Sequence, residues 1–422
     1  MRSMHLYIGL AAGSAIALTG CGTSGNQNGG STGPTSMSVV YNFQGQAPSV
    51  VAVKIGSGAY TLSSLMSGQL SLSVPNGTTS YAIAYVCPQA AGLGNIVTAE
   101  YVIEASTADG NSFTTTCNEV SGSTGSATGT VDTSAIAGVA NVLIRGSLGY
   151  GGSVGSGGGS FNVNLPSGTD DVAFIAVDGS GKVRAVKILR GQTVPGALNS
   201  GHTISFQASD QTTLQTLNVQ NVPSGFTSPA SASVGYVTAS GTPFVLDGDA
   251  AGQYPVIPAA SVQSGDFYAF EANTSDIGTH SASLGAMQNG TGGGAVTLSL
   301  PAPWTYTGPT PATLPTFDFN YSGYSGMAAV AQQAAIEWIP STNALYSLTV
   351  IATANYQAGS NSIAVPDLSS LGGFFPSATS GSKIYWVASV WGGTTPVFDF
   401  VSAPPSNASI SFVEQSGTFT AP

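Results

Sequence analysis

The chain has 422 residues, of which 42% are hydrophobic and only 6% are charged, with a formal net charge of −11. Ordinary soluble proteins carry about 25% charged residues, so the surface of this protein is unusually neutral. The hydrophobic content argues against intrinsic disorder, and the acidic balance lacks the basic footprint that nucleic-acid binding requires. About two to four domains are expected at this length.

The first residues have the layout of a secretory signal peptide. Arg2 precedes an apolar stretch over residues 6–18, which is shorter than the ~20 residues that span a bilayer. The sequence LTGC at residues 18–21 resembles the lipobox of bacterial lipoproteins. The resemblance implies that residues 1–20 are removed and that Cys21 is acylated, which would anchor the protein to a membrane. The alternative is an ordinary signal peptide followed by a chance cysteine.

A polar segment rich in glycine, serine and asparagine follows the lipobox. We therefore expect residues 21–36 to hold the lipidated Cys21 and a flexible tether. Gly22, rather than an aspartate, follows the cysteine. By analogy with bacterial lipoproteins this argues against retention at the inner membrane, so the expected location is the outer membrane or the cell surface.

Two cysteines remain after lipidation, Cys87 and Cys117. An even pair in an exported protein predicts a disulfide. A loop of this size would stabilise its domain by roughly 3–4 kcal/mol in the chain-entropy model. Two free thiols or a metal-binding pair are the alternative, although neither cysteine has the spacing or the neighbouring histidine of a zinc site.

Short alternating runs rich in valine, isoleucine, tyrosine, phenylalanine and threonine predict β-strands throughout the mature chain. Residues 69–86 align without gaps with residues 160–177, at an offset of 91. Both copies contain an alternating strand, a Pro-x-Gly-Thr turn and a second apolar strand. Residues 222–225 repeat the turn alone, and residues 363–367 repeat the strand and its proline. The sequence therefore predicts a modular protein.

The second copy continues into a turn and another alternating strand over residues 179–194. The segment 142–206 resembles the prealbumin-like β-sandwich domains related to the carboxypeptidase regulatory domain. This resemblance implies a seven-stranded sandwich without catalytic residues of its own. Domains of that family usually act as spacers or binding modules.

Composition suggests the domain boundaries. We expect one sandwich with a disulfide over residues 37–130, a prealbumin-like sandwich over 131–228 and a β-rich C-terminal region over 229–422. Glycine-rich residues 122–129 are a candidate link. A proline-rich stretch at residues 301–315 is either a linker or an edge-strand connection.

One segment is ambiguous between a helix and a β-hairpin. Residues 327–339 have the alanine content and length of a helix, but their apolar positions do not form a stripe with the 3.6-residue period. Residues 346–355 are strand-like, and residues 340–343 between them are typical of a turn. A β-hairpin therefore fits better than a helix.

Catalytic signals are weak. The mature chain contains two histidines, His202 and His280, both in turn-like surroundings. Residues 151–155 match the GxSxG string but lack the strand-to-helix context of a nucleophile elbow. Asp247 and Asp249 could supply two of the ligands of a calcium ion, but the remaining positions of an EF-hand are missing. We predict no catalytic residue, no metal and no cofactor.

Five of the eight basic residues lie in one strand-rich segment, where a solvated face is the expected arrangement: Arg145, Lys182, Arg184, Lys187 and Arg190. Aromatic residues give the strongest hint of binding. Tyr385, Trp386 and Trp391 flank one predicted strand and could stack on sugar rings. The alternative is that they fill the core between two sheets.

These observations predict an all-β, multidomain array of antiparallel β-sandwiches behind a lipoprotein signal peptide. The expected role is that of a non-catalytic cell-envelope lipoprotein, structural or adhesive, whose partners are the membrane through its lipid and an envelope glycan or protein. A glycan- or peptide-binding lipoprotein that uses its C-terminal aromatics is the alternative, and a hydrolase is a third.

Overall fold

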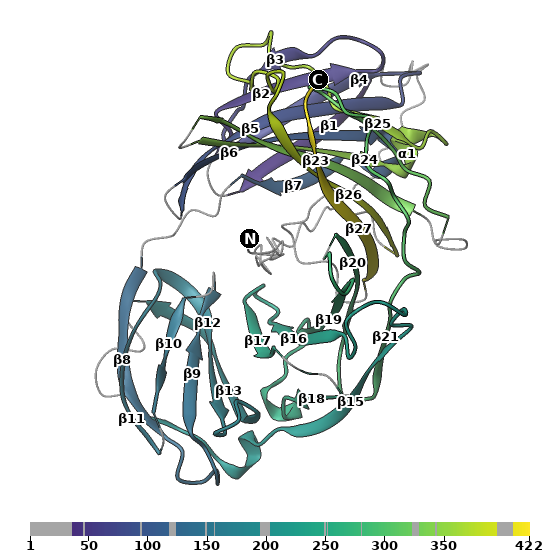
Figure 1. Ribbon diagram of the computed structural model, residues 1–422. Helices are drawn as coiled ribbons and strands as arrows, with labels where there is room; N and C mark the ends of the chain where they lie inside the picture. The colour runs from purple at the N-terminus through teal and green to yellow at the C-terminus, as the bar shows by residue number, and fades with distance from the viewer. Residues whose placement is uncertain are drawn as a thin grey trace, which may run out of the picture. The chain divides into compact units, whose positions relative to one another are not determined.

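The computed structural model describes residues 36–422 except 45–46, 93–94, 118–123, 148–149, 156, 195–202, 249, 251, 280, 323–328, 342–343 and 395–407. β-strands form nearly all of its regular structure (Figure 1). In this part of the chain the one α-helix is α1 (Ala354–Gln357), and no helix is long and apolar enough to cross a membrane. The expectation of a β-rich fold is confirmed.

The chain forms two compact units. Among the described residues, unit 1 contains 124–302 and 408–411, and unit 2 contains the segment up to 117 together with 303–394 and 412–422. Each unit contains two β-rich modules of similar strand order. Modules 2 and 3 form unit 1, and modules 1 and 4 form most of unit 2, so the first and last modules of the chain belong together.

Module 1 has a three-stranded sheet with the order β4-β1-β7, and a second layer of strands with the order β3-β2-β5-β6, which is part of a larger sheet. β1 pairs antiparallel with β4 on one side and parallel with β7 on the other. Its strands are β1 (Ser36–Gln44), β2 (Val50–Ile55), β3 (Thr61–Ser63), β4 (Gln69–Pro75), β5 (Ser80–Gly92), β6 (Asn95–Ser106) and β7 (Ser112–Thr116).

Module 2 repeats this arrangement, with the orders β11-β8-β14 and β10-β9-β12-β13. β8 is antiparallel to β11 and parallel to β14. Its strands are β8 (Thr124–Asp132), β9 (Asn141–Arg145), β10 (Gly151–Val154), β11 (Gly158–Pro166), β12 (Gly168–Val177), β13 (Val183–Val194) and β14 (Thr203–Ser205). Most of the candidate link at residues 122–129 is therefore strand β8, because its small side chains pair with β11.

Module 3 has the same topology again, with the orders β18-β15-β21 and β17-β16-β19-β20. β15 is antiparallel to β18 and parallel to β21. Its strands are β15 (Thr213–Gln220), β16 (Ser231–Val237), β17 (Pro243–Asp247), β18 (Gly252–Val256), β19 (Phe267–Ser275), β20 (Ala282–Gly290) and β21 (Val296–Ser299).

Module 4 follows the same plan with six strands. It has a two-stranded sheet, β25-β22, and a row of strands with the order β24-β23-β26-β27, which belongs to the same sheet as β6 of module 1. Its strands are β22 (Thr316–Asp318), β23 (Ala329–Ser341), β24 (Ala344–Thr353), β25 (Ser362–Ala364), β26 (Lys383–Gly393) and β27 (Ser409–Thr420). β23 and β24 form the hairpin that the sequence favoured over a helix.

In modules 1 to 3 the seventh strand covers one edge of the first strand. In module 4 a proline-rich segment covers the corresponding edge of β22. Thr310 bridges antiparallel to Thr316, and Trp304 donates a hydrogen bond through Nε1 to Oδ1 of Asn320 at 2.9 Å. The Trp304 ring stacks on Phe319, with 5.7 Å between the ring centroids. Prolines cannot donate to a sheet ladder, so this stretch closes the edge without offering a new one.

The sheets are mixed rather than purely antiparallel, which corrects one part of the expected fold. In modules 1 to 3 the last strand returns from the opposite sheet and lies parallel to the first strand. A crossover between two sheets permits parallel pairing, whereas a tight hairpin does not.

The fifth strand of each of the first two modules is buried on both faces. In β12 every side chain from Val172 to Val177 is buried. One face of this strand contributes Phe174 to the core of module 2, and the other contributes Ile175 to a core shared with module 3. Strands covered on both faces show continuous apolar runs rather than alternation, and this explains the second strand of each copy of the repeat.

The predicted domain boundaries fall at different places from the module boundaries. The expected boundary at residues 130 and 131 lies inside β8, and the one at 228 and 229 lies between β15 and β16. The expected C-terminal region 229–422 contains most of module 3 and all of module 4. Composition did not separate these modules because stretches rich in glycine, serine and proline occur within the modules as well as between them.

Candidate functional site

Several residues of the sequence analysis lie outside the described residues. Cys21 and its tether are among them, as are His202, His280 and Asp249. The predictions made for these positions remain predictions. Asp247 accepts a hydrogen bond from Nζ of Lys182 at 3.5 Å. Within the described ranges, no group of three or more His, Cys, Asp or Glu side chains could hold a metal ion.

The predicted disulfide between Cys87 and Cys117 is present. Cys87 is on β5, and Cys117 directly follows β7 in the opposite sheet of module 1. Both cysteines belong to the core of the module, next to Tyr85. The bond therefore links two different sheets of module 1 through the core of the module.

The three aromatic candidates do not form one exposed face. Trp386 is 8% exposed and Trp391 is 3% exposed, whereas Tyr385 is 42% exposed. Neighbouring residues on a strand point to opposite faces, so Tyr385 and Trp386 of β26 cannot stack on the same ligand. Trp386 packs edge-to-face against Tyr306, with 5.6 Å between the ring centroids, and Trp391 packs on Phe412 at 4.8 Å.

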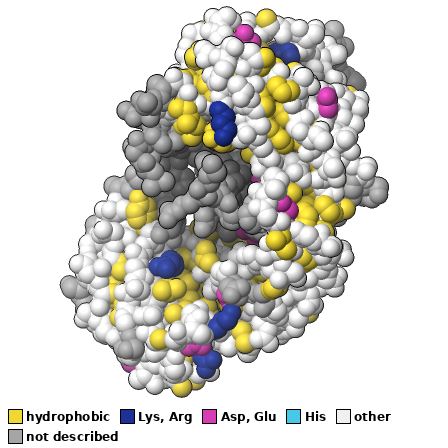
Figure 2. Space-filling model, viewed as in Figure 1, with side chains coloured by type: hydrophobic (Ala, Val, Ile, Leu, Met, Phe, Trp, Pro, Cys, Tyr) yellow, Lys and Arg dark blue, Asp and Glu magenta, His cyan; other side chains and the backbone are white. Residues whose placement is uncertain are grey.

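The basic segment does not form a single solvated face. On the face drawn in Figure 2 the charged side chains are few and scattered. Lys182 and Arg184 are about half exposed, with side-chain exposures of 53% and 51%, but the Arg190 side chain is only 18% exposed. Arg190 contacts two carboxylates, Asp171 at 3.2 Å and Asp266 at 2.6 Å. The expectation of a solvated face was wrong for Arg190, because module 3 covers it.

This buried cluster joins modules 2 and 3. The Asp266 carboxylate, whose side chain is fully buried, also accepts hydrogen bonds from the Tyr236 hydroxyl and the backbone N–H of Ala239, both at 2.7 Å. Asp171 accepts a hydrogen bond from the hydroxyl of Ser240 at 2.8 Å. Each charge is paired and hydrogen-bonded, as buried charges require. The cluster is therefore a structural joint within unit 1.

Modules 1 and 4 are joined by continuous strand pairing. β6 and β24 pair in parallel from Ala344 with Ile96 to Ala352 with Glu104. The side chain of Asp109, in the 3-10 helix after β6, accepts hydrogen bonds from Thr353 and Asn355 at the start of α1. Modules 1 and 4 thus share one sheet within unit 2.

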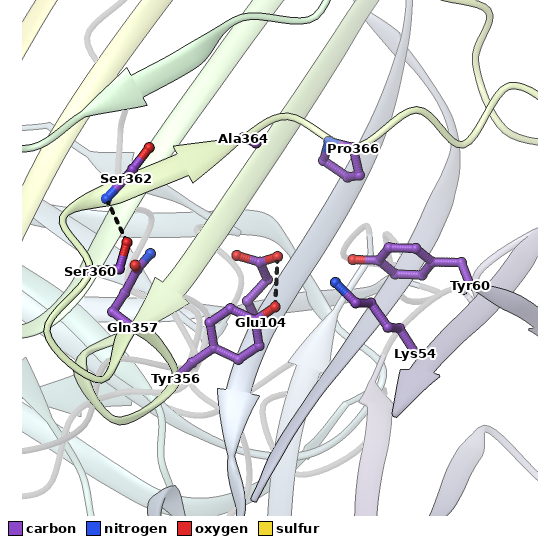
Figure 3. Close-up of a pocket in the computed structure, with 9 residues that line it drawn as sticks. All are labelled: Lys54, Tyr60, Glu104, Tyr356, Gln357, Ser360, Ser362, Ala364 and Pro366. Carbon is purple, nitrogen blue, oxygen red and sulfur yellow. Dashed lines mark hydrogen bonds between the residues drawn. The ribbon is translucent and has the colours of Figure 1, made fainter. Parts of the chain in front are cut away.

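A pocket of about 370 Å³ lies at this junction (Figure 3). It is lined by Lys54, Tyr60, Glu104, Tyr356, Gln357, Ser360, Ser362, Ala364 and Pro366. The first three residues come from module 1 and the others from α1, β25 and the segments that flank them in module 4. This pocket is the candidate functional site.

Strand register aligns the two charged residues of the pocket. Lys54 of β2 is opposite Ala82 of β5, and Ala82 is opposite Glu104 of β6. The three side chains therefore lie in one row on the outer face of the module 1 sheet. Because alanine between them has only a methyl group, the two longer side chains border a space above it. The register continues to Ala352 of β24, another small residue.

Burial controls the electrostatics of the pocket. It raises the pKa of Glu104, while a hydrogen bond from the Tyr356 hydroxyl at 3.2 Å and the nearby charge of Lys54 act in the opposite direction. Burial also raises the pKa of Tyr60 and Tyr356, so both phenols keep their protons near neutral pH. The Lys54 ammonium lies 5.6 Å from the centroid of the Tyr60 ring.

Sequence reasoning missed this pocket because its residues come from separate parts of two modules. Only tertiary contacts bring Lys54 and Tyr356 together. A partial signal exists at residues 81–86, an apolar run without alternation, which indicates that something covers the outer face of the sheet. That signal does not reveal which polar groups border the covered face.

Comparisons with known proteins give no identity. No protein-family model and no curated protein matches the chain. Among solved structures, a leucine-rich repeat protein from Bacteroides thetaiotaomicron is 13% identical with a TM-score of 0.14. The match covers 42% of this chain and only 27% of that protein. A likeness this low carries no argument about fold or function.

Proposed function

We propose that this protein is an exported lipoprotein, anchored through an acylated Cys21, with a non-catalytic structural or adhesive role at the outer membrane or cell surface. The observation that carries the proposal is the use of one sandwich plan four times, with modules joined in pairs. Repeated rigid modules suit a protein that bridges a distance or displays a surface, rather than an enzyme that transforms a substrate. The seven strands of module 2 also match the number that the prealbumin-like resemblance implies.

Two further features support export and display. The buried disulfide of module 1 suits an oxidising compartment. The low content of charged residues and the many hydroxyl-bearing ones suit an exposed surface in the envelope. The sequence LTGC at residues 18–21 supplies the attachment point.

The test of the anchor is cell fractionation of a Cys21→Ala variant. Acylation makes the wild-type protein sediment with membranes, because multiple acyl chains give a stable anchor. The variant should move to soluble fractions and lose incorporation of a labelled fatty acid. Ser24→Ala, in the tether outside the lipobox, is the matched control and should stay with membranes. An unmodified thiol at residue 21 by mass spectrometry would refute the anchor.

The role at the envelope is tested in cells that lack the protein. A structural role predicts increased leakage or detergent sensitivity of the envelope, and an adhesive role predicts reduced attachment to surfaces. Either phenotype should return with the wild-type gene but not with Cys21→Ala. Normal envelope integrity together with normal attachment would contradict the proposal.

A further inference from the structure

The pocket between modules 1 and 4 offers several hydrogen-bonding groups around a half-open space. In Figure 3 the Tyr60 hydroxyl and the Lys54 ammonium point toward the Glu104 carboxylate. The Tyr60 hydroxyl is buried, yet it has no hydrogen-bond partner among the described residues. A buried hydroxyl without a partner is costly, so a ligand that bonds to it would remove a penalty.

The donors and acceptors of the pocket are mixed. Glu104 accepts hydrogen bonds, Lys54 donates them, and the hydroxyls of Tyr60 and Ser362 can do both. A sugar hydroxyl is likewise both a donor and an acceptor. A ligand with several hydroxyl groups can therefore satisfy this set better than one that only accepts, such as a phosphate.

The charges of the pocket oppose each other. Lys54 and Glu104 are the charged residues that line it. An anionic ligand would be attracted by one and repelled by the other, and the same holds for a cation. The balance favours a neutral ligand.

The volume of the pocket and the residues that line it narrow the class of ligand further. A volume of about 370 Å³ lies at the low end of the usual range for ligand pockets, roughly 300–1,000 Å³. Tyr60 and Tyr356 contribute aromatic rings to the lining, while Ala364 and Pro366 are its aliphatic parts. A peptide side chain would require a larger apolar surface than these two residues supply.

We propose that the pocket formed by Lys54, Tyr60, Glu104 and Tyr356 binds a small neutral saccharide, a mono- or disaccharide or the end of a longer glycan. Hydroxyl groups of the sugar bond to Glu104 and Tyr60. This site differs from a surface built on Tyr385, Trp386 and Trp391. The inference goes beyond the anchor and does not depend on it, since binding should persist in a protein without acyl chains.

Binding can be measured by calorimetry on the full-length protein, in a detergent without a sugar headgroup. The probes are glucose, N-acetylglucosamine, maltose and cellobiose, with glucuronic acid and a neutral dipeptide as charged and peptide comparisons. At least one neutral saccharide should bind, and the two comparison probes should bind more weakly. Stronger binding of the acid or the dipeptide would overturn the ligand class, and no binding of any saccharide would overturn the site.

Single substitutions test whether the saccharide binds in this pocket. Tyr60→Phe removes a single oxygen and should weaken saccharide binding about tenfold, the value of one hydrogen bond of about 1.4 kcal/mol. Glu104→Gln should weaken it by a similar factor. Tyr346→Phe, which also removes one hydroxyl in the same unit but does not line the pocket, should bind as the wild type does. Unchanged affinity in Tyr60→Phe and Glu104→Gln would refute the proposal.

Folding is checked in the same samples. All four tryptophans lie in module 4, so the thermal transition seen by tryptophan fluorescence reports on the unit that holds the pocket. If Glu104→Gln lowers this transition, Tyr60→Phe decides the outcome, because it removes no partner from any described residue.

Discussion

The guanidinium of Arg190 in module 2 donates hydrogen bonds to both carboxylate oxygens of Asp266 in module 3, at 3.2 and 2.6 Å. This two-point geometry is the strongest form of an arginine–carboxylate contact. It fixes the second sheet of module 2 to the loop before β19. The pair lies beside the hydrophobic core that the two modules share, since Tyr236 of that core donates a hydrogen bond to Asp266. The ion pair and the shared core therefore hold the same two modules together.

We predict that Asp266→Ala destabilises unit 1 by about 3–5 kcal/mol, since it leaves Arg190 buried with its charge incompletely paired. The tryptophans lie in module 4, so tryptophan fluorescence should follow unit 2 alone. Circular dichroism should therefore show an earlier transition that fluorescence does not. Lys182→Ala is the matched control, because it removes the half-exposed lysine of an ion pair between the same modules and should cost no more than about 1 kcal/mol. Equal losses of unfolding free energy in the two variants would contradict the expectation that the more buried ion pair stabilises the unit more.

Removal of the disulfide should destabilise module 1. The double variant Cys87→Ala with Cys117→Ala opens a loop with a sequence separation of 30, which costs roughly 3–4 kcal/mol in the chain-entropy model. Since β6 and β24 pair across the two modules, the urea midpoint seen by module 4 tryptophans should also fall. A midpoint that stays constant, while circular dichroism shows loss of structure, would mean that modules 1 and 4 unfold separately.

The stability of unit 2 should depend on the ionisation of Glu100. Burial raises the pKa of Glu100 to about 7 from an ordinary value of 4.5, while a hydrogen bond from the N–H of Phe375 opposes this shift. The folded state therefore holds the proton more tightly than the unfolded state. The free energy of unfolding should be largest below about pH 4.5 and should fall as the pH rises to about 7, by up to roughly 3 kcal/mol.

Glu100→Gln removes this titration. Urea unfolding followed by tryptophan fluorescence at several pH values should show a weaker loss of stability with rising pH than in the wild type. Part of the dependence should remain, since burial also raises the pKa of Glu104 and Glu337. A slope equal to that of the wild type would show that Glu100 is not the group responsible.

Gly417 of β27 should not tolerate a side chain. A Cβ there would lie 2.6 Å from Cζ2 of the buried Trp386 ring, which cannot move away easily. Gly417→Ala should destabilise module 4 by about 1–3 kcal/mol, the usual cost of overpacking. Gly372→Ala, in open space within the same unit, should change the melting temperature little. A melting temperature for Gly417→Ala that matches the control would argue against the tight contact.

Local patterns predicted much of this fold. The alternating strands, the two-copy repeat and the cysteine pair are visible in the chain because each depends on neighbouring residues or on residue type. The aliphatic residue and proline of the two-copy repeat recur at the same place in all four modules. The fourth strand of every module is followed by a buried aliphatic residue and a proline, or ends in that pair: Val74-Pro75, Leu165-Pro166, Ile257-Pro258 and Val365-Pro366. Proline has no N–H and so ends strand pairing, which gives this dipeptide a structural reason.

By itself the sequence determined the alternating strands, because period-two alternation and turn residues act over a few positions of backbone. It also determined the candidate anchor at Cys21 and the cysteines available for a disulfide. Only the tertiary structure decided that Arg190 is buried by module 3, and that Lys54, Glu104 and Tyr356 border one pocket. These contacts arise when sheets from distant segments align in register, and register depends on the packing of whole faces rather than on any local run of residues.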